Sequence, residues 1–298
     1  MPEFLHTLWH VLEHSLLEAL RLLPFLYLSY LLMEFLEHKS GDIATRWLRR
    51  SGSVGPLVGG AMGAVPQCGF SAAATGLYAG RIITVGTLLA VYLSTSDEML
   101  PILISHGAPI PFMLKILATK LVVGALAGFA VDGVLRLIRK RRGEQLEPQI
   151  EELCEREHCG CGEHFALSAL WHTLRIGAFV LAVTFALNLT VELIGGEEGL
   201  QALMLNRPIL SNLLAAVVGL IPNCASSVVL TQLYLEGVIS VGAMLSGLLV
   251  NAGIGLALLF RNNRPVWDSV RILVILWCIG VLVGIGIDLT PLGVFLGI

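Results

Sequence analysis

A short polar motif occurs twice in this chain, each time inside an apolar stretch. Its frame is Gly-x-x-Pro-(Gln/Asn)-Cys-x-x-Ser, at residues 63–71 and again at 219–227. With the same offset, eleven identical pairs fall between residues 63 and 89 and their counterparts, so chance is a poor explanation. Proline breaks at matching places in two apolar halves are typical of transporters built from two repeats. The residues that the motifs offer as a substrate site are Gln67, Cys68, Ser71, Asn223, Cys224 and Ser227.

The composition places the chain in a membrane. Hydrophobic residues make up 55% of the sequence and charged residues 14%, and the mean hydropathy is +0.80, which lies outside the usage of soluble globular domains. Repeated runs of about 20 apolar residues match the thickness of a bilayer core. With a net charge of -3, the expected partner is the lipid bilayer and not a nucleic acid.

The apolar runs predict an all-α polytopic membrane protein with about ten transmembrane helices in two five-helix repeats. The first repeat covers residues 1–138 and the second covers 167–298, with a cytoplasmic Cys/His-rich loop at 139–166 between them. The expected helices are 8–36, 54–65, 68–79, 82–95 and 112–138, then 168–194, 208–221, 223–235, 238–260 and 270–288.

The two repeats are expected to be inverted. An odd number of spans in each half makes two consecutive copies insert in opposite orientations, which brings the broken or half helices together at the midplane. Nearly all loop Lys and Arg residues then lie on the cytoplasmic side if the amino terminus is outside, as the positive-inside rule requires. We therefore expect a multi-pass protein of the bacterial cytoplasmic (inner) membrane with both termini outside.

The two breaks could carry chemistry. Proline frees backbone carbonyls one turn earlier, so polar atoms become available at membrane depth. Gln67 and Asn223 could bind these carbonyls or a substrate, and Cys68 and Cys224 offer the sulfur ligands that soft metals and arsenicals prefer. The alternative is that the prolines only kink helices and the cysteines act as small hydrophobic residues.

The central loop holds a second candidate metal site. Three thiols and two imidazoles lie within eleven residues, enough for a tetrahedral ion. The alternative is a solvated loop with incidental cysteines. Its expected role is capture or sensing, because it lies outside the membrane. The candidate ligands are Cys154, His158, Cys159, Cys161 and His164.

Other ionisable residues lie in or near the apolar segments. His10 and His14 belong to a polar stripe at helical spacing that could contact a metal, or that could simply line an amphipathic interfacial helix. Charges at membrane depth are costly and often functional. On that ground Glu34, Asp97 and Glu98 are candidate coupling carboxylates, and Lys120 is the candidate charge partner.

At these residues the chain resembles the ten-span heavy-metal exporter family, whose members are also labelled arsenic efflux permease-like or manganese transporters. The resemblance covers almost the whole chain and implies export of a heavy-metal or metalloid species across the cytoplasmic membrane. It rests on residues 22–26, 30–34, 66–71 and 94–98, the Cys/His loop, and 222–225.

The sequence thus predicts a secondary transporter and not an enzyme. No nucleotide-binding loop is present, so the expected energy source is an ion or proton gradient. No cofactor is required, and the expected substrate is Zn, Cu, Cd, Mn or arsenite, with the paired thiols favouring the softer ions. A metal-permeable channel and a membrane metal sensor that uses the Cys/His loop are the alternatives, and assembly into a homo-oligomer is left open.

Overall fold

The fold is known from a computed structural model that describes residues 54–64, 69–96, 99–142, 208–223, 225–263 and 265–296, with single positions in 9–28 and 170–185. Every regular element in these ranges is a helix. The helices are Val54–Gly63, α3 (Gly69–Ala79), α4 (Val85–Ser94), α5 (Met99–Ser105), α6 (Ile110–Arg142), α10 (Pro208–Gly219), α11 (Ala225–Leu235), α12 (Val241–Val250), α13 (Ile254–Asn262), α14 (Val266–Leu289) and α15 (Leu292–Leu296).

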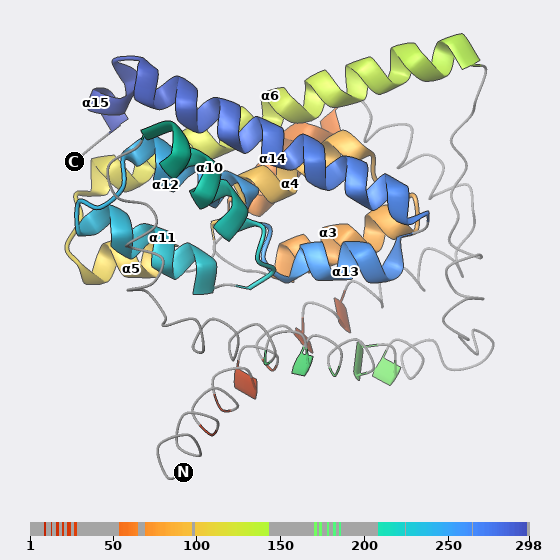
Figure 1. The fold of residues 1–298 in the computed structure, drawn as a ribbon. Coiled ribbons are helices and arrows are strands. Elements are labelled where there is room, and N and C mark those ends of the chain that lie inside the picture. Colours follow the sequence, from red (N-terminus) through yellow and green to blue (C-terminus); the bar gives the residue numbers. More distant parts are fainter. Residues whose placement is uncertain are drawn as a thin grey trace.

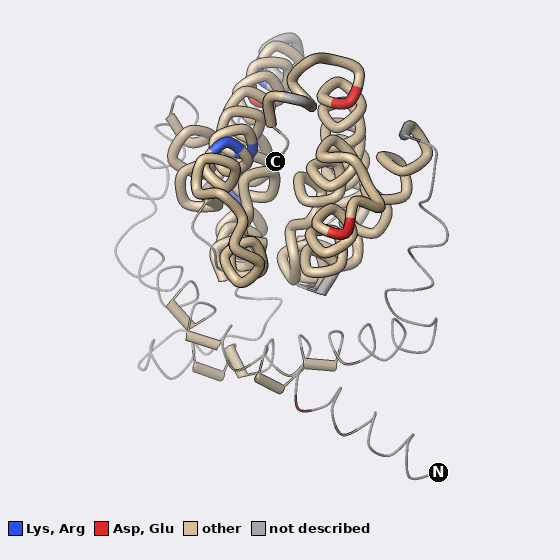
Figure 2. The backbone as a smooth tube through the Cα atoms, turned by 90° about the vertical axis from the view of Figure 1, so that its left-hand side faces the viewer, with Lys and Arg blue, Asp and Glu red and all other residues tan. Residues whose placement is uncertain are grey.

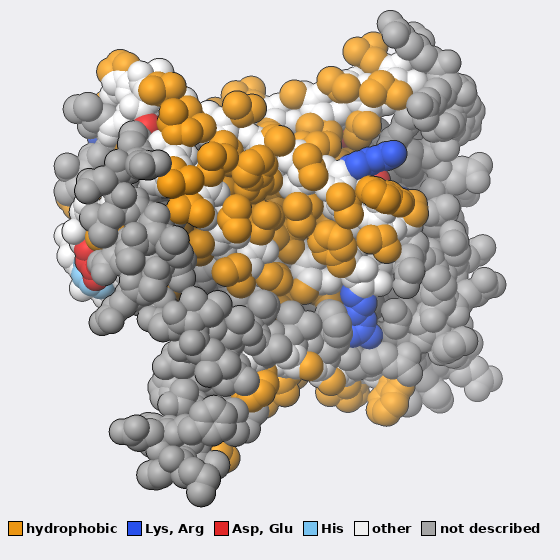
Figure 3. All heavy atoms as spheres, in the orientation of Figure 1, with side chains coloured by type: hydrophobic (Ala, Val, Ile, Leu, Met, Phe, Trp, Pro, Cys, Tyr) orange, Lys and Arg blue, Asp and Glu red, His pale blue; other side chains and the backbone are white. Residues whose placement is uncertain are grey.

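The described part contains four helical runs that are long and apolar enough to cross a membrane. They are Val85–Ser105, Ile110–Ile138, Val241–Asn262 and Val266–Leu289. Apolar side chains such as Leu126 and Leu282 are exposed on the outer helices, and Figure 3 shows one face covered largely by hydrophobic atoms. Acidic and basic residues are few along the described chain (Figure 2). Such a surface suits lipid and not water, so the protein is a multi-pass membrane protein.

The helices form a core that is covered on one side (Figure 1). α4 and α12 lie in the middle, and every one of their residues is buried. α6 packs on α4, α14 packs on α12, and both outer helices cross the core on the same side. The short helices α3 and α13 lie side by side at one end, and α5 and α11 lie side by side at the other.

Two pairs of short helices turn back on themselves. Helix Val54–Gly63 runs along α4, because Gly59 approaches Thr87 while Gly63 approaches Val91 and Ser94. α3 then returns to the start of α4, from which only residues 80–84 separate it. Ten or eleven residues of helix span about 15 Å, half of a bilayer core. α10 and α11 repeat this path beside α12. Each pair is therefore a hairpin, and the chain between its two helices contains a Pro-Cys segment.

The two halves have the same element order at a constant spacing. α3, α4 and α6 begin 156 residues before α11, α12 and α14 respectively. The match extends to backbone geometry, since Arg81 and Gly237 have the same offset and both have positive φ, 57° and 74°. A non-glycine residue rarely adopts such an angle, so equivalent turns impose it at both places.

Most expected boundaries agree with the structure, but the single helix expected at 238–260 is wrong. The chain forms α12 and α13 there, and residues 251–253 separate them. The Gly253 N–H donates to Asn251 Oδ1 at 2.9 Å, and Gly253 has a φ of 52°, which interrupts the helical hydrogen bonds. α6 also continues to Arg142, beyond the expected end at 138. Helices 8–36 and 168–194 lie largely outside the described residues.

Candidate functional site

The candidate site lies in the middle of the molecule, where short helices begin. α3 and α13 start together, because a Cβ atom at Gly255 would lie 3.0 Å from the Ser71 Cβ. They also end together, since Tyr78 and Asn263 both bond Asp268. α5 and α11 form the corresponding pair at the other end (Figure 1). Helix N-termini carry partial positive charge and free N–H groups, so the middle suits electronegative ligand atoms.

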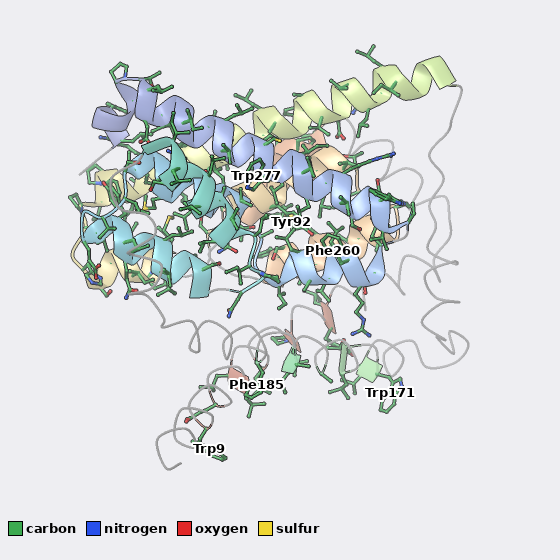
Figure 4. The ribbon with its side chains drawn as sticks, in the orientation of Figure 1. Trp9, Tyr92, Trp171, Phe185, Phe260 and Trp277 are labelled. Carbon is green, nitrogen blue, oxygen red and sulfur yellow. The ribbon has the colours of Figure 1, made fainter. Side chains whose placement is uncertain are left out.

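A buried hydroxyl cluster joins the first hairpin to the second repeat. Thr75 Oγ1 lies 2.6 Å from Tyr92 Oη, and the two hydroxyl oxygens lie 3.2 and 3.1 Å from the Gly255 carbonyl oxygen. Thr75 Oγ1 also lies 2.7 Å from the Ser71 carbonyl oxygen, the shortest of its contacts with a carbonyl. Tyr92 lies in the middle of the core (Figure 4). The predicted site residue Ser71 is thus fully buried beside α13.

The second hairpin holds its predicted residues in a similar setting. Asn223 and Ser227 are buried, with 1% and 2% of their surface exposed. Ser226 Oγ donates to the Asn223 carbonyl at 2.7 Å, which closes the turn into α11. Thr231 Oγ1 donates to the Ser227 carbonyl at 2.7 Å, just as Thr75 does with Ser71. Both hairpins therefore begin their second helix with the same hydroxyl contact.

Lys120 is the predicted coupling residue whose surroundings the structure describes. It lies on α6 with 1% of its surface exposed. Its ammonium donates to the carbonyl of Thr95, the residue that ends α4, and to the carbonyl of Leu248 in α12 at 2.8 Å. A single cation therefore contacts both broken helices.

A matched pair of carboxylates was not predicted as part of a functional unit. Asp132 accepts from the Thr84 hydroxyl at 2.6 Å and from the Gly86 N–H at 2.8 Å. Asp288 accepts from the Ser240 hydroxyl at 2.7 Å and from the Gly242 N–H at 3.1 Å. Each carboxylate caps the positive N-terminus of α4 or α12. The signal was present in the sequence, because the two aspartates are also 156 residues apart.

The far end of α3 and α13 carries an ion pair. Asp268 Oδ2 accepts from the Tyr78 hydroxyl at 2.6 Å and lies 3.2 Å from Arg81 Nη1. Asn263 Nδ2 adds a third contact at 3.1 Å. Burial works against the charged guanidinium, but the nearby Tyr78 and Asp268 oxygens raise the pKa of Arg81 above its ordinary value. The contact ties the first hairpin to the start of α14.

Several predicted residues lie outside the described ranges. Within those ranges no group of three or more His, Cys, Asp or Glu side chains could hold a metal. The substrate, metal and coupling roles expected of the residues outside those ranges stay predictions. These residues are Gln67, Cys68, Cys224, Glu34, Asp97, Glu98, His10, His14, Cys154, His158, Cys159, Cys161 and His164.

Comparison with known proteins gives one match. A search of curated proteins and a search of solved structures each found none. A family model described as "Putative, 10TM heavy-metal exporter" matches residues 20–198, more than half of the chain. The match includes the first Pro-Cys hairpin, α4 and α6, and the predicted resemblance is thereby confirmed. The chain belongs to this family of ten-transmembrane heavy-metal exporters.

Proposed function

We propose that the protein is a secondary transporter that exports a soft metal or metalloid ion across the bacterial cytoplasmic membrane through a site between its two hairpin tips. Heavy-metal export as the general activity follows from the family. The observation that carries the proposed site is the recurrence of the hairpin and broken helix at a spacing of 156 residues, with a Pro-(Gln/Asn)-Cys segment before α3 and before α11.

The chemistry of the tips supports this substrate class. Cys68 and Cys224 immediately precede α3 and α11 in the chain. Partial positive charge at a helix N-terminus stabilises a thiolate, and thiolates prefer zinc, copper, cadmium and trivalent arsenic over manganese. Buried Ser71, Asn223 and Ser227 would complete a polar lining.

The arrangement of the helices supports alternating access by inverted repeats. Within the described ranges, the α3/α13 pair and the α5/α11 pair lie at opposite ends of the core (Figure 1). In this scheme both termini are outside, the loop 139–166 is cytoplasmic and delivers or senses metal, and an ion or proton gradient supplies the energy. Glu34, Asp97 and Glu98 are the candidate proton carriers.

The test is metal flux by the purified protein in proteoliposomes. Replacing Cys68 and Cys224 together by Ala should lower flux by at least about tenfold at limiting metal, since a tenfold loss of affinity is about 1.4 kcal/mol. Cys278→Ala is the matched control, because that thiol is exposed on α14 and its loss should leave flux unchanged. Undiminished flux in the double variant would remove the thiol site, and flux without a dependence on a driving gradient would favour a channel.

A further inference from the structure

Lys120 sits at a place where a charged side chain is costly. It belongs to the run Ile110–Ile138, which is apolar enough to cross a membrane, and only 1% of its surface is exposed. An ammonium at such depth survives only when polar atoms compensate for the lost water. Its ammonium donates to two backbone carbonyls, those of Thr95 and Leu248.

Both carbonyls belong to helix ends. Thr95 is the C-terminal cap of α4, and Leu248 lies in the last turn of α12, which ends at Val250. The last carbonyls of a helix have no intrahelical donor and carry the negative end of the helix dipole. The two helices come from different repeats, so the ammonium joins the two broken helices at the middle of the molecule.

Carbonyls at the broken ends of membrane helices are the ligands with which two-repeat transporters coordinate a coupling cation. Here a side chain already supplies a positive charge to such carbonyls. The equivalent position of the second repeat is Leu276, which is fully buried and apolar. Of these two positions, only the one in the first repeat therefore supplies a cation.

We propose that the Lys120 ammonium takes the place of an inorganic coupling cation between α4 and α12, so that the protein assembles its midplane site without bound sodium. This inference deepens the proposed transport function and rests on it. Lys120 acts as a positioning residue, because its contacts hold the ends of α4 and α12, beside which the first helix of each hairpin ends at Gly63 and Gly219.

The first test is thermal unfolding of the purified protein in choline, sodium and n-propylammonium chloride. Lys120→Ala removes three methylenes and the ammonium, which n-propylammonium restores. We expect a lower Tm for this variant, with a recovery of at least about 2 °C in n-propylammonium. Lys120→Met fills the same space without charge and should show no recovery. Lys115→Met is the matched control, because Lys115 lies on the same helix but donates to the Phe295 carbonyl at an exposed site.

The second test is metal flux by the wild-type protein with sodium replaced by choline on both sides. Wild-type flux should be the same in both salts. The flux of the Lys120→Ala variant should be at least about tenfold lower than that of the wild type, and n-propylammonium should restore part of it. The proposal is overturned if wild-type flux requires sodium, if Lys120→Met matches the wild type, or if Lys120→Ala behaves as wild type. Should both Lys120 variants fail to fold, the wild-type sodium dependence decides. If a stable wild-type protein shows no metal flux, the proposed function is wrong. The thermal unfolding results would still test whether the Lys120 ammonium occupies the place of a cation between α4 and α12.

Discussion

The two halves of the molecule share their supports but differ at their ends. In both, an aspartate from the long outer helix caps the buried inner helix, at Asp132 and at Asp288. At one end of the core, Tyr78 donates to Asp268. At the equivalent place on the other end, Tyr234 stacks on Phe112, with ring centroids 5.6 Å apart. Tyr78 and Tyr234 are 156 residues apart, and so are Phe112 and Asp268.

The comparison separates two kinds of feature. The aspartate caps occur in both repeats, whereas the contacts of Tyr78 and Tyr234 differ between the two ends of the core. Both repeats have a buried inner helix whose N-terminus needs a cap, and both supply it with a carboxylate and a hydroxyl. The contacts at the ends are electrostatic on one side and aromatic on the other. Two such contacts respond differently to salt and to substitution, so experiments can weaken the contact at one end without weakening the contact at the other.

The largest effect is expected from removing the shared caps. Asp132→Ala and Asp288→Ala each leave a buried N–H and a hydroxyl without their acceptor, and each should lower the free energy of unfolding by about 3 kcal/mol. Thermal unfolding in detergent measures this loss. Thr290→Ala, two residues from Asp288 and exposed, is the control and should change little. A neutral result for one aspartate alone would show that the repeats do not share their support.

A somewhat smaller effect is expected at the glycines beneath the caps. A Cβ atom at Gly86 would collide with the Gly128 carbonyl and Asp132, and one at Gly242 would collide with the Gly284 carbonyl and Asp288. Gly86→Ala and Gly242→Ala should each cost about 2 kcal/mol by overpacking.

Gly133 provides the matched control for this pair. It lies on α6, and among the described residues no atom from outside its own stretch of helix lies within 4 Å of its Cβ position. Gly133→Ala should therefore be neutral or should stabilise the protein by up to about 1 kcal/mol. Equal tolerance at all three positions in thermal unfolding would contradict the close helix approach in both repeats.

Much of the helical layout could be predicted from hydrophobicity and proline position. The expected segments 68–79 and 223–235 agree closely with α3 and α11. The break at residues 251–253 was missed because Asn251, Ala252 and Gly253 barely lower the hydropathy of a long apolar run. The repeat does indicate this break, because Asn251 is 156 residues after Thr95, where α4 ends.

The site was less predictable because its contacts use backbone atoms and distant helices. The sequence indicates that Lys120 lies in an apolar segment, but its acceptors are carbonyls of two other helices, whose positions depend on packing. In the sequence Asp132 is an isolated charge near the basic end of a helix. Its role becomes visible only when the N-terminus of α4 is placed beside it.

The smallest effect is expected at the ends, where the comparison is sharpest. The side chains of Arg81 and Asp268 are 18% and 26% exposed, so solvent screens their attraction. A double-mutant cycle with Arg81→Ala and Asp268→Ala should give a coupling free energy of about 0.5 kcal/mol that falls as salt is raised.

The matching cycle at the other end uses Phe112→Ala and Tyr234→Ala. Stacked aromatic rings contribute about 0.5–1.5 kcal/mol beyond the area they bury, and this coupling should be insensitive to salt because neither ring is charged. Both cycles are measured by thermal unfolding at low and high ionic strength. If both couplings weaken with salt, or neither does, the two ends are not distinguished by electrostatics. A salt dependence confined to Arg81 and Asp268 would instead identify the α3/α13 end as the one that ionic strength can loosen while the α5/α11 end stays closed.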